Sequence, residues 1–496
     1  MKKFAFTLVF LMLTVPFSSA QTPFPQATPE SQGVSSVSIL EFVNHAEAEI
    51  DALHSLMILR HGHLVAQGWW EPYDAQSPHM LFSLSKSFTS TAIGMAISEG
   101  ILSLDDTVIS FFPNETPDTP SDNLKAMRIR DLLAMNSGHQ EDTSDDFFKH
   151  PGQSWVKTFL SLEVEHKPGT HFVYNSGATY MLSAILQKAT GKTLIDFLTP
   201  RLFEPLQITN PTWESDPQGI NIGGWGLKVR TEDIAKLGQL YLQKGQWQGK
   251  QLIPESWVEM ATSRQTSNGS NPQSDWEQGY GYQFWRCRHN IYRGDGAFGQ
   301  YCIVMPDQDA VVAITSGVPD MQAVLNLVWD YLLPGIHQGV LPEDADIQKN
   351  LADKLAGLCI KFPEGASKSP MAAAISGQSF EFETNEAGFQ SVKIDVSEDR
   401  YVITFKNKYG VHSFNCGLGA WEKGQTILEQ SEPQPVAASG AWESPDHFVV
   451  KLCYYETPFC PRLDFNFAGG KLNFSMKANV TFGTENPVVL TGQVKK

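Results

Sequence analysis

The amino-acid sequence predicts an α/β sandwich, in which helices cover an antiparallel sheet, followed by a second domain built only of strands. Strand-like segments lie near both ends of the first 340 residues and helical segments lie between them, so distant parts of the chain must meet in one sheet. Beyond about Gly339 the sequence changes to evenly spaced short strands. A chain of 496 residues also exceeds one ordinary hydrophobic core, so two domains are expected.

Composition is typical of a soluble globular protein, because 42% of the residues are hydrophobic and 18% are charged. The formal net charge of −17 argues against nucleic acid as a partner and against docking on anionic lipid, since both are bound by clustered lysine and arginine. A small molecule or a short peptide is the expected partner, and the oligomeric state stays open.

The N-terminus has the features of a secretory signal peptide. Lys2 and Lys3 precede an apolar run over residues 4–15, and small residues then end at Ala20. The run is shorter than the roughly 20 apolar residues that a membrane span needs. We therefore expect cleavage after Ala20, export to the periplasm or the medium, and no membrane insertion of the mature protein.

The first elements after the signal peptide are predicted to be a helix over 36–50 and a hairpin with strands over 55–60 and 64–67. The turn between the strands contains His61 and His63. A metal site is not expected there, because Val65 stands where the HxHxD pattern of metallo-hydrolases requires Asp. No metal and no cofactor are expected elsewhere.

The remaining elements follow from the spacing of apolar residues. Helices are predicted over 83–100, 178–190, 195–202, 231–242, 321–333 and 346–358, and strands over 282–287, 300–305 and 311–315. Alternating strands follow a linker at 363–370, over 392–396, 401–405, 448–452, 463–467 and 472–476. The predicted boundaries are a signal peptide at 1–20, a sheet-and-helix domain at 24–340, a helix and linker at 341–374 and an all-β domain at 375–496.

All six cysteines lie in the second half of the chain, and an oxidising compartment would permit disulfides. The pairs Cys287–Cys302 and Cys453–Cys460 are the first candidates, since each could bridge neighbouring strands. Buried free thiols are the alternative.

Ser83 and Lys86 form an S-x-x-K motif at the start of an amphipathic helix that is predicted to end at Gly100. Residues three apart lie on one helical face, so the lysine amine can reach the serine hydroxyl. Burial lowers the pKa of a lysine, which can then accept the hydroxyl proton. The same motif at Ser154 and Lys157 lies in a short segment bounded by Pro and Gly and is interpreted as a chance match.

The second candidate motif is Tyr174-Asn175-Ser176. Beside the ammonium group of Lys86 the phenolate of Tyr174 should be favoured, and it could then pass protons to a leaving group. The alternative is a core tyrosine that leads into the helix beginning near Ala178.

Five ordered segments resemble the serine β-lactamase-related family, which groups class C β-lactamases, D-alanyl-D-alanine carboxypeptidases, some esterases and aminohexanoate-oligomer hydrolases. The resemblance implies that Ser83 is the nucleophile, that Lys86 is its paired amine and that Tyr174 is the catalytic tyrosine. It also implies that Ser176 meets the lysine or the substrate. The segments are FSLSKSFTSTAIGMAISEGILSLDDTV (82–108), RDLLAMNSGH (130–139), YNSGATYMLSAILQKATGKTL (174–194), GGWGLKVRTEDIAKLGQLYLQKG (223–245) and GAFGQYCIVMPDQDAVVAITSG (296–317).

The third motif departs from the family pattern. Relatives place K-T-G or H-x-G on the sheet edge, where the cation helps to hold a substrate carboxylate. Gly294-Asp295-Gly296 takes that place here, so efficient β-lactam hydrolysis is not expected. Arg288 or Arg293 could supply the charge instead, or could be surface arginines.

The glycine that closes the third motif is retained at Gly296, as close approach of a ligand to an edge strand requires. The N–H of Ala297 is then expected to form an oxyanion hole with the N–H of Ser83.

The leading hypothesis is an exported serine hydrolase that cleaves an ester or an amide through an acyl-enzyme. The alternative is a penicillin-binding-type module that is acylated, or binds cell-wall peptides, with little turnover. The C-terminal strands resemble the lipocalin-like barrels of some relatives, which implies a stabilising or lid-like accessory domain. A third possibility is that this barrel itself presents a carbohydrate or a lipid.

Overall fold

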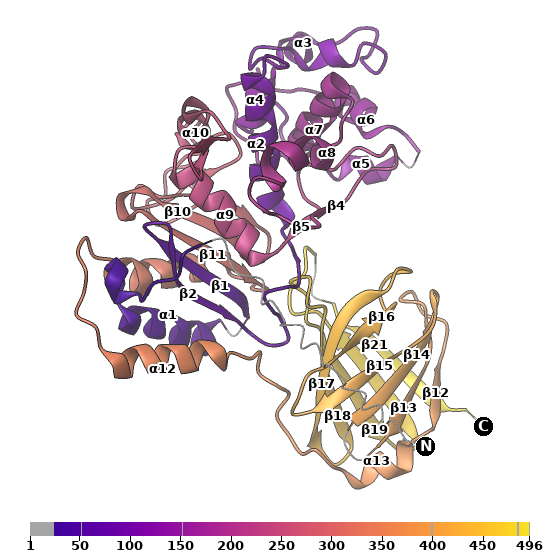
Figure 1. Ribbon diagram of the computed structural model, residues 1–496. Helices are drawn as coiled ribbons and strands as arrows, with labels where there is room; N and C mark the ends of the chain where they lie inside the picture. The colour runs from indigo at the N-terminus through magenta and orange to yellow at the C-terminus, as the bar shows by residue number, and fades with distance from the viewer. Residues whose placement is uncertain (1–23, 51, 151, 398–399, 484–485, 496) are drawn as a thin grey trace, which may run out of the picture.

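The computed structural model describes residues 24–50, 52–150, 152–397, 400–483 and 486–495, which form a sheet-and-helix unit next to a β-barrel (Figure 1). The predicted signal peptide lies outside the described residues. Within the described residues, no helix combines the length and the hydropathy that crossing a bilayer would require.

The first unit is built on a six-stranded sheet with the order β2-β1-β11-β10-β9-β8. Every pair of neighbours is antiparallel, and strands from the beginning of the domain lie beside strands from its end, which confirms the predicted assembly. The strands are β1 (Leu53–Arg60), β2 (His63–Trp69), β8 (Trp285–Arg286), β9 (Tyr292–Gly296), β10 (Gln300–Met305) and β11 (Ala310–Ser316).

Successive side chains of β10 point into two different cores, as the pleat of a strand requires. Cys302 and Val304 pack into the core on the side of the helical region, whereas Tyr301 and Ile303 pack into the core on the opposite face. The opposite face is covered by α1 (Ser36–Glu49), α11 (Met321–Leu327) and α12 (Ala345–Ala356).

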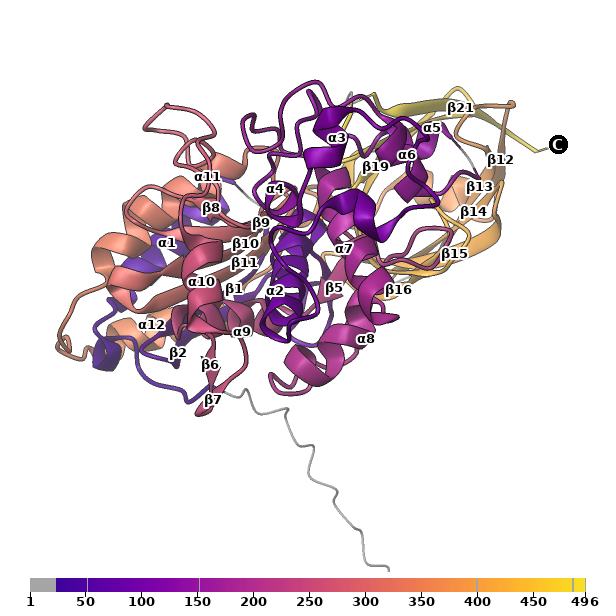
Figure 2. The same ribbon diagram turned by 90° about the horizontal axis from the view of Figure 1, so that it is seen from above.

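The helical side of the sheet is covered by α9 and by the helical region beyond it. Figure 2 shows α2 between the sheet and α7. The helices on this side are α2 (Ser85–Ser98), α3 (Asp122–Ala126), α4 (Ile129–Leu133), α5 (Asp146–Lys149), α6 (Trp155–Ser161), α7 (Ser176–Thr190), α8 (Leu194–Leu198), α9 (Thr231–Leu242) and α10 (Glu255–Thr262). The short strands are β3 (His79–Met80), β4 (Thr212–Trp213), β5 (Leu227–Val229), β6 (Gln246–Trp247) and β7 (Lys250–Gln251).

Helix ends follow the predicted glycine caps. Gly191 ends α7 with a φ of 68°, and Gly100 follows α2 with a φ of 72°, both in the left-handed region that glycine adopts at low cost. One strand is shorter than predicted: the segment 282–287 contributes only β8, because the backbone turns at Gln283, whose φ is 64°.

The C-terminal unit is a closed β-barrel, which confirms the predicted all-β domain. Its ten-stranded sheet runs from β15 to β16, and a short parallel pairing of β15 with β17 closes the ring. The elements are α13 (Pro370–Ile375), β12 (Ser379–Phe382), β13 (Phe389–Val396), β14 (Arg400–Asn407), β15 (Gly410–Leu418), β16 (Glu422–Thr426), β17 (Gln434–Ser444), β18 (His447–Cys453), β19 (Arg462–Ala468), β20 (Lys471–Lys477) and β21 (Val488–Val494).

The interior of the barrel is packed with aromatic side chains. Phe405, for example, lies within ring-contact distance of Phe389, Phe465 and Phe474. The core of the barrel is also separate from the two cores of the sheet-and-helix unit. This packing favours a structural role for the barrel interior over the capture of a ligand in it.

The structure settles the two candidate disulfides differently. Cys453 and Cys460 are bonded, as predicted. The predicted Cys287–Cys302 pair is wrong, because both thiols are free and buried. Cys302 packs in the core on the helical side of the sheet and Cys287 in the core on the other face, so the sheet itself separates them.

Candidate active site

Ser83 lies in the short 3₁₀ helix η2 (Phe82–Leu84), which runs directly into α2. α2 is buried throughout its first three turns, although its sequence includes many Ser and Thr residues. Their hydroxyls are satisfied by backbone carbonyls of other segments: Ser87 donates to Gln283 at 2.9 Å and Ser90 to Tyr282 at 2.7 Å. These bonds fix the helix, and therefore Ser83, against the segment that enters β8.

The Lys86 amine is the centre of the site. Its Nζ donates to Ser83 Oγ at 2.9 Å, to Ser176 Oγ at 3.1 Å and to the carbonyl oxygen of Gly224 at 2.8 Å. The side chain is 1% exposed. An amine has three N–H donors when it is protonated, so these three acceptors satisfy the ammonium form completely.

Burial lowers the pKa of Lys86 from 10.5 to about 8, while the carboxylates of Asp142 and Asp295 act in the opposite direction. The resulting pKa lies about one unit above pH 7, so the ammonium form predominates there and roughly a tenth of the amine is neutral. A base with a pKa near the working pH is well suited to accept a proton from a serine hydroxyl.

Tyr174 lies beside this pair. The Lys86 Nζ is 4.8 Å from the centroid of the Tyr174 ring, and the ring stacks on Trp285 at 5.2 Å. Burial, followed by the charge of Asp295, raises the pKa of the phenol above its usual value, although the Ser83 hydroxyl acts to lower it. The expectation that the phenolate is favoured is therefore wrong for the free protein, because desolvation and the charges of the nearby carboxylates outweigh the groups that lower the pKa.

Ser176 begins α7, and its position is fixed from two directions. The preceding Asn175 caps the helix by accepting a hydrogen bond from the N–H of Ala178 at 3.1 Å. The N–H of Ser176 donates to Asp142 Oδ1 at 2.9 Å, and its hydroxyl meets Lys86. Asp142 thus lies next to the site, in a segment that sequence reasoning did not single out.

The third motif lies on β9, directly against η2 and α2. A Cβ added to Gly294 would lie 2.5 Å from both Leu84 Cδ1 and Ser87 Oγ. A Cβ added to Gly296 would overlap the carbonyl oxygen of Leu81. The strand can approach this closely only because both positions lack a side chain. A lysine side chain at position 294, where relatives carry the motif cation, would need space that Leu84 and Ser87 already fill.

Neither arginine supplies the missing cation in free form. Arg293 is 0% exposed and its guanidinium pairs with Asp295 at 2.8 Å, while Trp276 covers it at 4.4 Å. Arg288 pairs with the buried carboxylate of Asp275 at 2.8 Å. Both suggestions made for these residues, a free charge at the site and a surface arginine, are therefore wrong, because each guanidinium is held in an internal ion pair.

The N–H groups of Ser83 and Ala297 are the predicted oxyanion donors. Ala297 lies in the turn between β9 and β10, where the N–H of Gly299 donates to the carbonyl oxygen of Gly296 at 3.1 Å. Since Gly296 packs on Leu81, this turn and η2 are direct neighbours. Neither N–H donates to another described residue.

Besides Asp142, two further contacts of the site were missed by sequence reasoning. The carbonyl oxygen of Gly224 accepts from Lys86, and Trp285 stacks on Tyr174. Gly224 falls within the GGWG segment at 223–226, so its glycines were the available indication of a backbone approach. Trp285 had no comparable indication.

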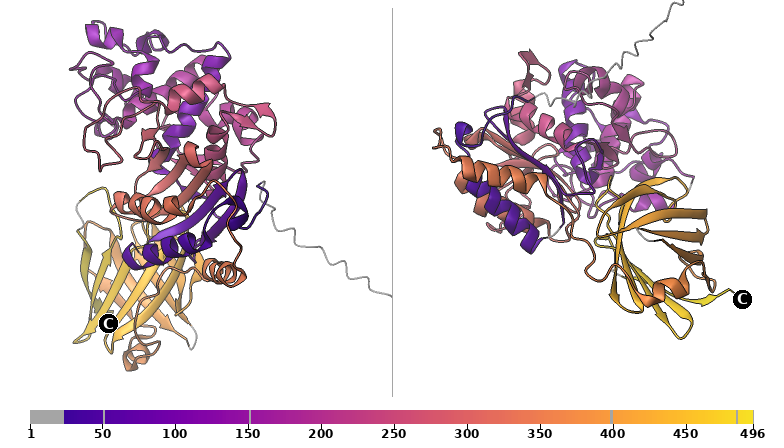
Figure 3. Two further views of the ribbon diagram at one scale, coloured as in Figure 1. Left: turned by 90° about the vertical axis from the view of Figure 1, so that its left-hand side faces the viewer. Right: turned by 60° about the horizontal axis from the view of Figure 1, so that its bottom comes forward.

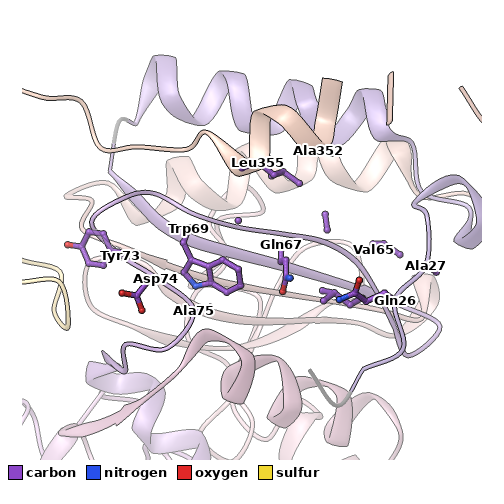
Figure 4. A pocket seen from close by; sticks show the side chains of 14 residues that line it. Gln26, Ala27, Val65, Gln67, Trp69, Tyr73, Asp74, Ala75, Ala352 and Leu355 are labelled. Atoms are coloured by element: carbon purple, nitrogen blue, oxygen red, sulfur yellow. The ribbon is translucent and has the colours of Figure 1, made fainter. Parts of the chain in front are cut away.

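The cavity shown in Figure 4 lies elsewhere, between the edge strand β2 and α12. Its volume is about 540 Å³. Trp69, Tyr73 and Asp74 line one end of it and Leu355 its roof, and its lining includes no serine, cysteine, lysine or histidine. It therefore offers no nucleophile for acyl transfer.

The chain is similar in sequence and fold to known hydrolases. The 6-aminohexanoate-dimer hydrolase of Paenarthrobacter ureafaciens is 23% identical over 287 residues, which cover 54% of this chain and 73% of that protein. A candidate 6-aminohexanoate-dimer hydrolase from Bacillus anthracis superposes with a TM-score of 0.52 at 21% identity, covering 64% of this chain and 89% of that one. EstCE1, a hydrolase with promiscuous acyltransferase activity, superposes with a TM-score of 0.51 at 16% identity, covering 61% and 99%.

The hydrolase relatives share the fold of the sheet-and-helix unit. The Beta-lactamase family domain matches residues 47–326, which is more than half of the chain and includes every residue of the candidate site. This chain therefore belongs to the Beta-lactamase family.

Proposed function

We propose that this protein is an exported serine hydrolase that cleaves an ester or an amide of a small molecule or a short peptide through an acyl-enzyme on Ser83. The observation that supports this most strongly is the 2.9 Å contact between Lys86 Nζ and Ser83 Oγ in a buried setting. The names of the relatives, an amide hydrolase and an esterase-like hydrolase, fit the same type of chemistry.

In the acylation step Ser83 Oγ attacks the substrate carbonyl and transfers its proton to the neutral Lys86 amine. The N–H groups of Ser83 and Ala297 bind the developing oxyanion. The phenol of Tyr174, which burial keeps protonated, donates its proton to the leaving alcohol or amine and recovers one from the Lys86 ammonium.

In the deacylation step a water molecule takes the place of the leaving group. The water transfers a proton to the Lys86 amine as it attacks the acyl carbonyl, and the ester bond to Ser83 Oγ breaks. The acid is released and the serine hydroxyl is restored, so no cofactor is needed.

The absence of a free cation at the third motif bears on the substrate. Gly294 stands where relatives have a lysine or a histidine, and Asp295 is paired with Arg293. A substrate carboxylate would gain no charge partner there, which favours neutral esters and amides over β-lactams.

Export is part of the proposal. It is supported by the signal-peptide features of residues 1–20 and by the Cys453–Cys460 disulfide, which an oxidising compartment would maintain.

The proposal is tested by replacing Ser83 with alanine in the mature protein. We expect Ser83→Ala to abolish labelling by a fluorophosphonate probe and to reduce p-nitrophenyl acetate hydrolysis by roughly a thousandfold or more. Ser154→Asn is the matched control, because Ser154 has the same S-x-x-K spacing but caps α6, a role that asparagine can keep.

Unchanged labelling of the Ser83→Ala protein would remove Ser83 from the mechanism. Labelling of the wild type without turnover of any ester or amide would instead support the penicillin-binding-type alternative.

A further inference from the structure

Four phenylalanine rings meet at the segments that carry the two candidate oxyanion donors, two rings from each unit of the protein. Phe82 directly precedes Ser83, and Phe298 directly follows Ala297. Phe459 and Phe482 come from connections between barrel strands. The ring centroids of Phe298 and Phe482 are 4.7 Å apart, and those of Phe82 and Phe482 are 5.3 Å apart.

Phe459 completes the group, at 5.9 Å from Phe298 and 6.3 Å from Phe82. The separations lie in the range of favourable aromatic pairs. The barrel therefore packs Phe459 and Phe482 against Phe82 and Phe298, which are next in the chain to the two proposed oxyanion donors. Figure 1 and Figure 3 show the barrel below the helical region and beside the sheet, in agreement with these contacts.

The barrel segment that supplies Phe459 is fixed in place. It is the connection between β18 and β19, which the Cys453–Cys460 disulfide closes. The N–H of Met80, three residues before Ser83, donates to the carbonyl oxygen of Glu456 at 2.8 Å. The hydroxyl of Tyr73 donates to the carbonyl oxygen of Thr457 at 3.2 Å.

Asn479 joins the second barrel connection, between β20 and β21, to the same place. Its Nδ2 donates to the carbonyl oxygen of Pro458 at 2.9 Å and to that of Gly317 at 3.2 Å. Its Oδ1 accepts from the N–H of Cys460 at 2.7 Å. Both connections are thus anchored to each other and to the sheet-and-helix unit, and Phe482 extends from this anchor.

The backbone at the two inner rings is unusual. Phe82 has a φ of 46° and Phe298 a φ of 65°, in the left-handed region that bulky side chains avoid. Such strained positions concentrate at ligand-binding and catalytic sites. Here they hold the two rings next to Ser83 and Ala297 and against the barrel.

Phe482 is 73% exposed although the rings of Phe82 and Phe298 lie next to it. Phe298, in the same group, is only 8% exposed. A large apolar side chain that is left in water at the edge of a reactive site gains free energy when an apolar ligand covers it.

We propose that the barrel completes the substrate site, and that Phe482 and Phe459, together with Phe82 and Phe298, bind an apolar chain of the acyl group. The inference rests on the proposed acyl-enzyme function. The acyl group stays bonded to Ser83 through both chemical steps, and Phe82 is its direct neighbour in the chain. The protein is accordingly specific for acyl donors with a medium-length apolar chain, and the barrel is a specificity element.

The test compares p-nitrophenyl acetate, butyrate and hexanoate with the full mature protein, so that the leaving group stays constant. Wild type should show a kcat/KM that rises with chain length. Since burial of one methylene corresponds to about a fourfold gain, Phe482→Ser should lower the hexanoate-to-acetate ratio of kcat/KM by roughly tenfold. Phe482→Leu should restore most of the ratio.

Val411→Ser is the matched control, because Val411 is another exposed apolar residue of the barrel, 66% exposed, on β15. It should leave the ratio unchanged. The inference is overturned if Phe482→Ser keeps the wild-type ratio within twofold, or if Val411→Ser lowers the ratio equally. If Ser83→Ala abolishes acetate hydrolysis but Phe482→Ser keeps the wild-type hexanoate-to-acetate ratio, only this inference is refuted. If wild type and Ser83→Ala hydrolyse acetate equally well, the serine hydrolase proposal itself is refuted.

Discussion

In the proposed mechanism the reactivity of Ser83 depends on the burial of a single neighbouring amine, that of Lys86. Lys86 is enclosed by α2, α7 and the Gly224 carbonyl, and burial brings its pKa to about 8. The charges of Asp142 and Asp295 oppose this effect, so the pKa of the amine is lowered by desolvation and raised by the two carboxylates. A serine beside such an amine needs no histidine to be activated.

This balance predicts a pH dependence. In the proposed mechanism the neutral form of Lys86 is the base. It is the minor form below a pKa of about 8 and the major form above it, so kcat/KM should rise about tenfold per pH unit below pH 8 and level off above it. The measurement is the initial rate of p-nitrophenyl acetate hydrolysis between pH 6 and 9.5, with the uncatalysed rate subtracted at each pH.

Lys86→Arg is the control for this pH dependence, since a guanidinium stays protonated throughout the range. We expect it to lose activity at every pH. A wild-type profile that is flat between pH 6 and 8 would mean that Lys86 does not act as the base.

The sequence predicted which side chains of the site would be close together, but not their environment. The three-residue spacing of Ser83 and Lys86 is a local property of a helix, so it could be inferred without tertiary contacts. The raised pKa of Tyr174 depends on burial against Trp285, which is 111 residues away in the chain (285 minus 174). The Gly224 carbonyl that accepts from Lys86 is a backbone group, and so no side chain could mark its role.

At the scale of elements, the site depends on the close approach of β9 to η2 and α2. Gly294 faces the ends of side chains, Leu84 Cδ1 and Ser87 Oγ, which can move. Gly296 faces the backbone carbonyl of Leu81, which cannot move without displacing the start of η2 and the nucleophile that follows. The two glycines of one motif should therefore differ in their tolerance of a methyl group.

We expect Gly296→Ala to lower the free energy of unfolding by about 1–3 kcal/mol, as overpacking of a fixed site does, and to abolish ester hydrolysis. Gly294→Ala should cost less stability and leave measurable hydrolysis. Chemical denaturation and p-nitrophenyl acetate assays of both variants provide the comparison. Equal effects of the two substitutions would mean that the Leu81 carbonyl does not limit the approach of β9.

Elements that depend on the local spacing of apolar residues were predicted well, whereas features that depend on tertiary contacts were not. α9 spans the predicted range, because its apolar residues recur at helical spacing and lie largely buried. α2 was interpreted as amphipathic, yet most of its Ser and Thr residues are buried. Ser87 and Ser90, for example, donate to backbone carbonyls of the 282–283 segment. Sequence alone cannot distinguish a hydroxyl that faces water from one that bonds a distant backbone.

At the scale of the whole molecule, a buried histidine cluster lies where the barrel meets the sheet-and-helix unit. His54 Nδ1 is 3.1 Å from His79 Nε2, and the His54 ring stacks on Tyr73 at 3.7 Å. Tyr73 donates to the barrel carbonyl of Thr457, and Met80, next to His79, donates to that of Glu456. A charge in this cluster would have no carboxylate partner among its contacts.

Acid should therefore weaken the protein, because the unfolded chain binds protons on these histidines that the folded cluster excludes. Burial lowers the pKa of His79 from 6.5 to about 4 and lowers that of His54 as well. The unfolded chain binds the His79 proton below pH 6.5 and the folded protein only near pH 4, so stability is fully present above pH 6.5 and falls as the pH drops toward 4. The loss from His79 alone is about 3 kcal/mol over that interval.

Urea unfolding at pH 7, 6, 5 and 4.5 measures this loss, and His79→Gln isolates it from the carboxylates that titrate in the same range. The free energy of unfolding of the variant should fall less steeply between pH 6.5 and 4 than that of the wild type. The difference in slope should correspond to one bound proton. Identical pH dependence of stability in both proteins would mean that His79 titrates alike in the folded and unfolded states, and the two units would then be joined without this acid-sensitive contact.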